Sequence, residues 1–217
     1  MNDYARITSF VRSMAKEDEG TLKEIYLDAI RRGVPVIRPE ARELLKTQLL
    51  LKKPKHVLEI GTAVGYSSIY MTEYLPEDAD VTTLELSEER VAEARSNIER
   101  MGRSSQIQVI CGDAAQTLKS LPDDTYDFAF VDAAKAQYIY YLPDVMRVLV
   151  PGGVIVSDNI LQEGEVLESH FLVEKRNRTI HDRMREYLDV LTHDERLETA
   201  ILPVGDGMAI SILLKNA

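Results

Sequence analysis

The chain lacks several features that would place a protein in one broad class at once. It has no tryptophan and a single cysteine, Cys111, so no disulfide can form within it. No apolar run approaches the roughly 20 residues of a membrane-spanning helix. Charged residues also interrupt the opening MNDYARITSFVRSM, where a signal peptide would have its apolar core. We therefore expect a cytoplasmic protein without a membrane span, in which Cys111 is a buried, structural residue.

Basic residues are in the minority. The 217 residues include 26 Lys and Arg against 36 Asp and Glu, which gives a formal net charge of −10 at pH 7. The surface as a whole therefore repels nucleic acids and anionic membranes, and a polyanionic partner would need a local basic patch. The length and the 45% hydrophobic content fit one domain. We expect a helical cap over 1–53 and an α/β core over 54–217.

Short β-type runs alternate with helical patterns through most of the chain. The β-type runs are HVLEI, DVTTLEL, IQVIC, YDFAFVD and GVIVSD. Helical periodicity lies between them, and also before the first run, where Pro39 suits a first helical position. The alternation predicts a mostly parallel sheet covered by helices on both faces. TAILPV and MAISILL, joined by GDG, predict a closing hairpin, so that one of seven strands runs antiparallel to the others.

A glycine-rich loop, within VLEIGTAVGYSS, follows the first β-type run. Gly61 and Gly65 allow a positive φ and a close approach of a ligand to the backbone. Their spacing is not the G-x-G-x-x-G that binds a pyrophosphate, which counts against a nicotinamide-dependent dehydrogenase. Glu59 precedes the first glycine by two positions, where its carboxylate repels phosphate and suits a ligand with an ammonium or sulfonium group.

Acidic residues follow the next strands, at the sheet edge where open parallel sheets bind ligands. Glu85 ends the second strand, about two dozen residues after Gly61, at the spacing of an acid that binds a ribose diol. Asp113 follows the third strand and suits either an exocyclic amine such as that of adenine or the cap of the next helix. The succession predicts a nucleoside pocket without a phosphate cradle.

Three further oxygen-bearing residues follow the fourth and fifth strands: Asp132, Asp158 and Asn159. If these strands are neighbours, their ends lie about 5 Å apart, and the side chains converge. Two carboxylates so close either share a proton or hold a cation. With no His or Cys nearby, the oxygen ligands favour Mg²⁺. The other interpretation is a turn at Asp158-Asn159.

These motifs, in this order, carry a resemblance. VLEIGTAVGYSS, the Glu85 strand end, GDA, VDAAKAQY and GGVIVSDN resemble the cation-dependent class of S-adenosylmethionine (SAM) O-methyltransferases, the group of catechol and caffeoyl-CoA enzymes. The match runs from about VPVIRPE to LPVGDGMAIS. Within that class, VPVIRPE, DAAKAQY, PVGDGMAIS and a basic stretch before the last helix are most similar to the bacterial tRNA 5-hydroxyuridine methyltransferase branch. The resemblance implies a Rossmann-like class I methyltransferase fold and a homodimer.

The resemblance also implies a role for each matching residue. Asp132, Asp158 and Asn159 would hold the metal. Lys135, three positions after Asp132, would lie beside the attacking oxygen, as its general base or as a cation that stabilises the oxyanion; without the motif it reads as a solvated lysine at a helix start. As a metal ligand, Asp132 is predicted to be a catalytic residue as well. The residues implied to contact the cofactor are Ile37, Glu59, Gly61, Gly65, Ser67, Glu85, Asp113, Ala114 and Asp132.

The acceptor of the methyl group stays open between two kinds of molecule. A catechol and 5-hydroxyuracil both present a hydroxyl beside a second oxygen, so one metal site suits either. EKRNRTIHDRMR, residues 174–185, has a local excess of about three positive charges, which suits tRNA phosphates, a solvated face or a dimer surface. The net charge and the lack of an RNA-binding domain favour a small catechol. Ala134 stands where plant enzymes of the class have an acid, which disfavours a coenzyme A thioester. A protein that binds a nucleoside without catalysis is a further alternative, against which the metal triad and Lys135 count.

Overall fold

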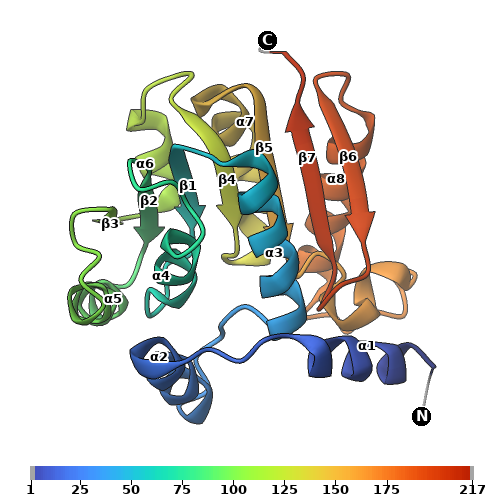
Figure 1. The fold of residues 1–217 in the computed structure, drawn as a ribbon. Coiled ribbons are helices and arrows are strands. Elements are labelled where there is room, and N and C mark those ends of the chain that lie inside the picture. The colour runs from blue at the N-terminus through green and yellow to red at the C-terminus, as the bar shows by residue number, and fades with distance from the viewer. Residues whose placement is uncertain (1–2, 216–217) are drawn as a thin grey trace.

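A seven-stranded sheet forms the centre of the molecule, with the strand order β3-β2-β1-β4-β5-β7-β6 (Figure 1). The structure is a computed structural model that describes residues 3–215. All neighbouring strands run parallel except β7, which is antiparallel to both β5 and β6. The predicted sheet and closing hairpin are thereby confirmed. The strands are β1 (His56–Ile60), β2 (Asp80–Glu85), β3 (Ile107–Cys111), β4 (Tyr126–Val131), β5 (Leu149–Asp158), β6 (Leu197–Leu202) and β7 (Met208–Leu213).

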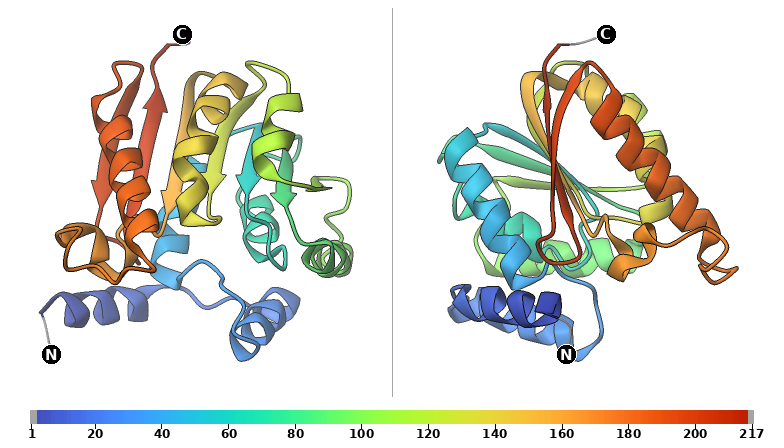
Figure 2. Two further views of the ribbon diagram at one scale, coloured as in Figure 1. Left: turned by 180° about the vertical axis from the view of Figure 1, so that it is seen from behind. Right: turned by 90° about the vertical axis from the view of Figure 1, so that its right-hand side faces the viewer.

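Helices cover both faces of the sheet (Figure 2). One core joins α3, α4 and α5 to side chains such as Val57 and Phe128, and the other joins α6, α7 and α8 to Leu58 and Ala129. Alternate residues of one strand therefore enter opposite cores, as the pleat of a strand requires. The helices are α1 (Asp3–Met14), α2 (Gly20–Arg31), α3 (Pro39–Lys52), α4 (Tyr66–Thr72), α5 (Glu88–Arg100), α6 (Ala114–Ser120), α7 (Tyr138–Val148) and α8 (Arg178–His193), with short 3-10 turns η1 (Lys135–Gln137) and η2 (Gln162–Leu167).

The N-terminal helices α1 and α2 lie below the sheet, at the edge toward which the parallel strands point (Figure 1). Pro39 begins α3, as its fixed φ favours. Behind it, the buried Arg42 guanidinium donates to Asp18 and to the Tyr66 hydroxyl, each at 2.7 Å. Tyr66 in turn donates to Asp18 at 2.6 Å. This buried, hydrogen-bonded group ties the segment between α1 and α2 to the start of α4.

The expectation that Cys111 is buried is wrong. Cys111 is exposed, because it ends β3, which lies at the edge of the sheet and has a strand on one side only. The other edge strand, β6, likewise has exposed positions. Among the residues described, no helix is long and apolar enough to cross a membrane.

Candidate active site

A cavity of about 890 Å³ opens at the carboxyl edge of the parallel strands. Its walls come from the loops after β1, β2, β3 and β4, from the turn after β5, and from the segment between α2 and α3. Chain segments far apart in sequence meet here because the parallel strands all end at this edge. The lining includes nine of the twelve residues predicted from the sequence: Ile37, Gly61, Ser67, Glu85, Asp113, Ala114, Asp132, Lys135 and Asn159.

Gly61 occupies a position in the cavity wall that has no room for a side chain. Its φ is +107°, and a Cβ there would lie 1.9 Å from the backbone oxygen of Asp132. The register pairs Ile60 with Val131, so Gly61 and Asp132 leave neighbouring strands at the same level. Only glycine therefore lets the loop after β1 pass this close to the end of β4. The bare backbone on the cavity side suits the close approach of a ligand.

Gly65 and Glu59 lie outside the residues that line the cavity. Gly65 has φ +81° at the start of α4, and a Cβ on it would meet Ala94 of α5 at 3.3 Å. Packing against α5 therefore explains why this position is a glycine. Direct contact between Gly65 and a cofactor stays a prediction. Glu59 is fully buried in the sheet, where its Oε2 accepts from the Ser68 and Thr83 hydroxyls and its Oε1 has no partner. Burial raises the pKa of Glu59 to about 7.

Glu85 and Asp113 both face the cavity and both also order the backbone. Glu85 accepts from the amide N–H of Ala63 at 3.0 Å and from that of Ser87 at 2.9 Å, which fixes the two loops on either side of it. Asp113 accepts from Ala115 N–H at 2.9 Å and so caps α6. Asp113 therefore caps α6, as one of its two interpretations predicted, and it also lines the cavity. The ribose and adenine roles stay predictions.

Asp132, Asp158 and Asn159 come together where β4 and β5 end; Asp132 and Asn159 line the cavity, whereas Asp158 is buried and is not among the lining residues. The register pairs Val131 with Ser157, so Asp132 and Asp158 follow at the same level of neighbouring strands. The Tyr138 hydroxyl joins the two strand ends, because it accepts from Ala133 N–H at 3.2 Å and donates to the Asp158 carbonyl at 3.1 Å.

The electrostatics of this end of the cavity fit a divalent cation. Asp158 is 1% exposed; its Oδ1 accepts from Asn159 N–H at 2.7 Å, and its buried Oδ2 has no partner. Desolvation, and then the charge of Asp132, raise the pKa of Asp158, and desolvation also raises the pKa of Asp132. An unpaired buried carboxylate oxygen beside a second carboxylate is costly without a cation, so the residues present suit Mg²⁺.

Lys135 has a partner that the sequence analysis missed. Its Nζ donates to Asp206 Oδ2 at 3.3 Å, and Asp206, which is 5% exposed, lines the cavity. The other oxygen of Asp206 accepts from Glu163 N–H. Asp206 belongs to the GDG turn of the closing hairpin, where an aspartate is common for turn geometry alone. Nothing in its local sequence pointed to Lys135, which is 71 positions away.

An ion pair between Arg38 and Glu163 lies at the cavity as well. Arg38 immediately precedes α3, and Glu163 lies in η2, so the pair connects the N-terminal helices to the segment after β5. The two residues are 125 positions apart, and both side chains line the cavity. The motif VPVIRPE carries no sign of this contact in the sequence, because its partner lies 125 positions away.

Comparison with known proteins identifies the family. The model of the O-methyltransferase family matches residues 13–214. The chain is 33% identical over 191 residues to the catechol O-methyltransferase of Niastella koreensis, covering 83% of this chain and 84% of the relative. It is 34% identical over 178 residues to the caffeoyl-CoA O-methyltransferase of Stellaria longipes, covering 78% and 73% respectively. The chain therefore belongs to the O-methyltransferase family that its motifs resemble.

A solved structure supports the cofactor. The O-methyltransferase from Bacillus cereus, solved in complex with SAH, superimposes with a TM-score of 0.83 at 26% sequence identity and covers 96% of this chain and 97% of its own. The Rossmann-like methyltransferase fold is confirmed, and with it the enzyme class. The protein is a SAM-dependent O-methyltransferase.

Proposed function

We propose that the enzyme transfers the methyl group of SAM, in a Mg²⁺-dependent reaction, to a hydroxyl that has a second oxygen beside it. The observation that carries this proposal is the buried, unpartnered Oδ2 of Asp158, next to Asp132 and Asn159, two residues that line the cavity. Bound by these three residues, Mg²⁺ would lower the pKa of the acceptor hydroxyl. The oxygen-only ligand set is the one that this ion prefers.

The chain's own contribution is to position the reactants and to handle one proton. Lys135 holds its ammonium at the cavity through Asp206, where it either receives the hydroxyl proton or stabilises the oxyanion. The glycine loop brings bare backbone against the cofactor, whose sulfonium supplies the methyl group. Correct alignment of such a donor and acceptor can lower a barrier by roughly 7 to 11 kcal/mol.

The metal part is tested by its removal. We expect methylation of a catechol to stop in excess EDTA and to return with Mg²⁺, and Asp158→Ala to be inactive while it still binds SAM in calorimetry. Asp189→Ala, a change of the same type on the exposed face of α8, is the matched control and should keep full activity. Undiminished activity of Asp158→Ala, or activity in EDTA, would exclude the metal role.

For the acceptor, we propose 5-hydroxyuridine in tRNA, which the reaction would convert to 5-methoxyuridine. The guanidinium groups of Arg178, Arg183 and Arg185 donate to backbone carbonyls, which do not neutralise their charge. The start of α8 therefore keeps positive charge that attracts phosphate. A small catechol is the second candidate, favoured by the activity named for the Niastella koreensis relative.

Nucleoside analysis separates the two acceptors. We would digest tRNA from cells with and without the gene and compare the nucleosides by mass spectrometry. Loss of 5-methoxyuridine and its derivatives, with 5-hydroxyuridine in their place, is the expected result. An unchanged pool would defeat the tRNA proposal, and activity on a catechol in the same preparation would then favour the small-molecule acceptor.

We also propose that the enzyme works in the cytoplasm as a homodimer. The support for a dimer is an exposed apolar row on α1, spaced at i, i+3, i+4 and i+7: Ile7, Phe10, Val11 and Met14. These side chains are between 43% and 64% exposed. A contiguous apolar face of this kind marks a protein contact more often than a free surface.

A further inference from the structure

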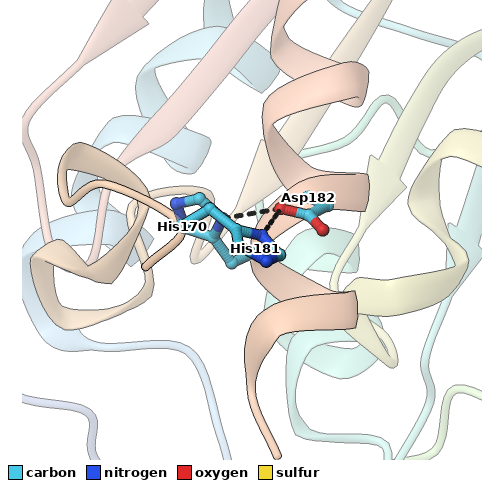
Figure 3. Close-up of side chains that lie close together, drawn as sticks. All are labelled: His170, His181 and Asp182. Carbon is cyan, nitrogen blue, oxygen red and sulfur yellow. Dashed lines mark hydrogen bonds and ion pairs between the residues drawn. The ribbon is translucent and has the colours of Figure 1, made fainter. Parts of the chain in front are cut away.

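Two histidines and an aspartate gather outside the cavity, where α8 begins. His181 and Asp182 lie in the first turns of α8, and His170 lies in the segment between η2 and α8 (Figure 3). None of the three lines the cavity. They therefore have no role in the proposed methyl transfer, whichever molecule is the methyl acceptor.

The three side chains point at one another. Asp182 Oδ1 lies 2.7 Å from His170 Nδ1 and 3.0 Å from His181 Nδ1. One ligand atom from each residue falls within 4.8 Å of the others. Tetrahedral ligands at zinc distances are separated by about 3.3 Å, so side-chain rotation would have to bring the widest pair of these atoms closer by up to about 1.5 Å. His170 and Asp182 are 41% and 52% exposed at the side chain, which leaves a path from solvent.

The hydrogen bonds of His181 are the observation that points to a bound cation. Its side chain is 1% exposed, and its Nε2 lies 3.1 Å from the Glu168 carbonyl. A carbonyl only accepts, so Nε2 carries the hydrogen. In the neutral ring Nδ1 then has a lone pair, yet it faces a carboxylate oxygen that is also an acceptor. Two acceptors 3.0 Å apart repel each other unless a metal ion lies between them or a second proton on Nδ1 makes the ring an imidazolium.

We propose that His170 Nδ1, His181 Nδ1 and the Asp182 carboxylate form a binding site for Zn²⁺, with water as the fourth ligand. Metal-binding histidines usually donate their other ring N–H to a carbonyl or carboxylate, as His181 does to Glu168. Two imidazoles and a carboxylate suit zinc, whereas the oxygen-only set in the cavity suits Mg²⁺. The two sites therefore select different ions.

The position of the site indicates what bound zinc would do. His170 belongs to the same connection as η2, which carries Glu163 and its ion pair with Arg38 at the cavity. Arg178 already holds this connection to α8 through the carbonyls of Val173 and Phe171. Arg185 and His181 also contact it, through the carbonyls of Val166 and Glu168. Zinc would add a further tie at His170 and so hold the connection against α8. We assign it a structural role rather than a catalytic one.

Metal titration of the full-length protein tests the site. The chelator-treated enzyme would be titrated with Co²⁺, whose visible absorption reports tetrahedral coordination, and then with Zn²⁺ in competition with a chromophoric chelator. We expect one tetrahedral Co²⁺ per chain, displaced by one equivalent of Zn²⁺, and a higher melting temperature with Zn²⁺. His170→Gln and Asp182→Asn alter exposed groups and should weaken Zn²⁺ binding at least about tenfold.

Two control variants make the result specific. His193→Gln changes an exposed histidine that faces Asp189 near the end of the same helix, without a third ligand, and should bind Zn²⁺ as the wild type does. Asp158→Ala removes the proposed Mg²⁺ site and should also leave the tetrahedral Co²⁺ signal unchanged. Its failure to methylate would bear on the proposed function and not on the zinc site.

Three results would overturn the proposal. They are equal Zn²⁺ affinity in the wild type and His170→Gln, no tetrahedral Co²⁺ signal in the wild type, or a signal lost in Asp158→Ala but kept in His170→Gln. The cluster would then be an ion pair between a doubly protonated His181 and Asp182. Nitrogen-15 NMR of the imidazole would show that pair as two protonated ring nitrogens unaffected by Zn²⁺.

Discussion

At the scale of single residues, three buried carboxyl groups in and around the cavity have different surroundings. Asp206 is paired with Lys135, Asp158 has an oxygen without a partner, and Glu59 lies among hydroxyls inside the sheet. The pairing with Asp206 orients the Lys135 ammonium, and the unpaired oxygen of Asp158 suits a metal ion. Burial raises the pKa of Glu59, so this carboxyl group resists ionisation. Two of the three give predictions that substitution tests directly.

Asp206→Asn separates charge from shape at Lys135. The amide oxygen can still accept from Glu163 N–H, while the negative charge that holds the Lys135 ammonium is lost. We expect kcat to fall by up to about a hundredfold, the lower end of the roughly 10²- to 10⁴-fold that a positioned proton-transfer group contributes, with little change in the KM for SAM. The pH dependence of kcat should also shift. An unchanged kcat and pH profile would show that Asp206 serves only the backbone.

Glu59→Gln changes how stability depends on pH. The folded pKa of Glu59 is raised by burial to about 7, so the folded state keeps a proton that the unfolded chain releases near pH 4.5. Glu59 therefore stabilises the folded state fully below the unfolded pKa of 4.5, and this contribution is lost as the pH rises through about 7. The loss is on the order of 3 kcal/mol. Urea unfolding of the ligand-free protein at pH 5 and pH 8 should show a smaller difference in Glu59→Gln.

At the scale of elements, the glycine loop after β1 depends on the close packing of two strand ends. Gly61→Ala would place a Cβ 1.9 Å from the Asp132 carbonyl oxygen, so β4 or the loop must move. We expect a loss of several kcal/mol of stability and of nearly all activity, since Asp132 moves with it. Gly33→Ala has a similar positive φ but nothing within 4 Å, and should cost only about 1 kcal/mol. Thermal unfolding compares the two; equal losses would contradict the packing argument.

At the scale of the whole molecule, the exposed row on α1 should decide assembly. Phe10→Asp puts a charge on that row and should shift the protein from dimer to monomer in size-exclusion chromatography with light scattering. Leu51→Asp, at a residue 74% exposed on α3, makes the same change elsewhere and should leave the dimer intact. A dimer that survives Phe10→Asp would place the interface on another surface.

Much of the fold followed from local pattern. Val57, Leu58 and their neighbours mark a buried strand by composition, and Pro39 marks a helix start by its fixed φ, so short-range physics sufficed for both. Cys111 shows the limit of that approach. Its strand is apolar in sequence, but β3 lies at the sheet edge, and edge position depends on strand order.

The candidate site divides in the same way. Asp132 and the Asp158-Asn159 pair were found because residues that end neighbouring parallel strands must meet at one edge. Asp206 and Glu163 were missed because a hairpin turn and a short 3-10 turn reach the cavity from positions with no periodic relation to the strands. The packing that requires Gly65 was missed for the same reason, since Ala94 lies on a different helix.

By itself, the sequence determined the alternation of strands and helices, the glycine loop and the acids that end each strand, because these depend on neighbours a few residues away. Only the tertiary structure decided which side chains face each other across the cavity, that Glu59 lies buried behind it, and that His170 meets His181 and Asp182. Those contacts join positions brought together by packing of the whole chain, and no local pattern encodes them.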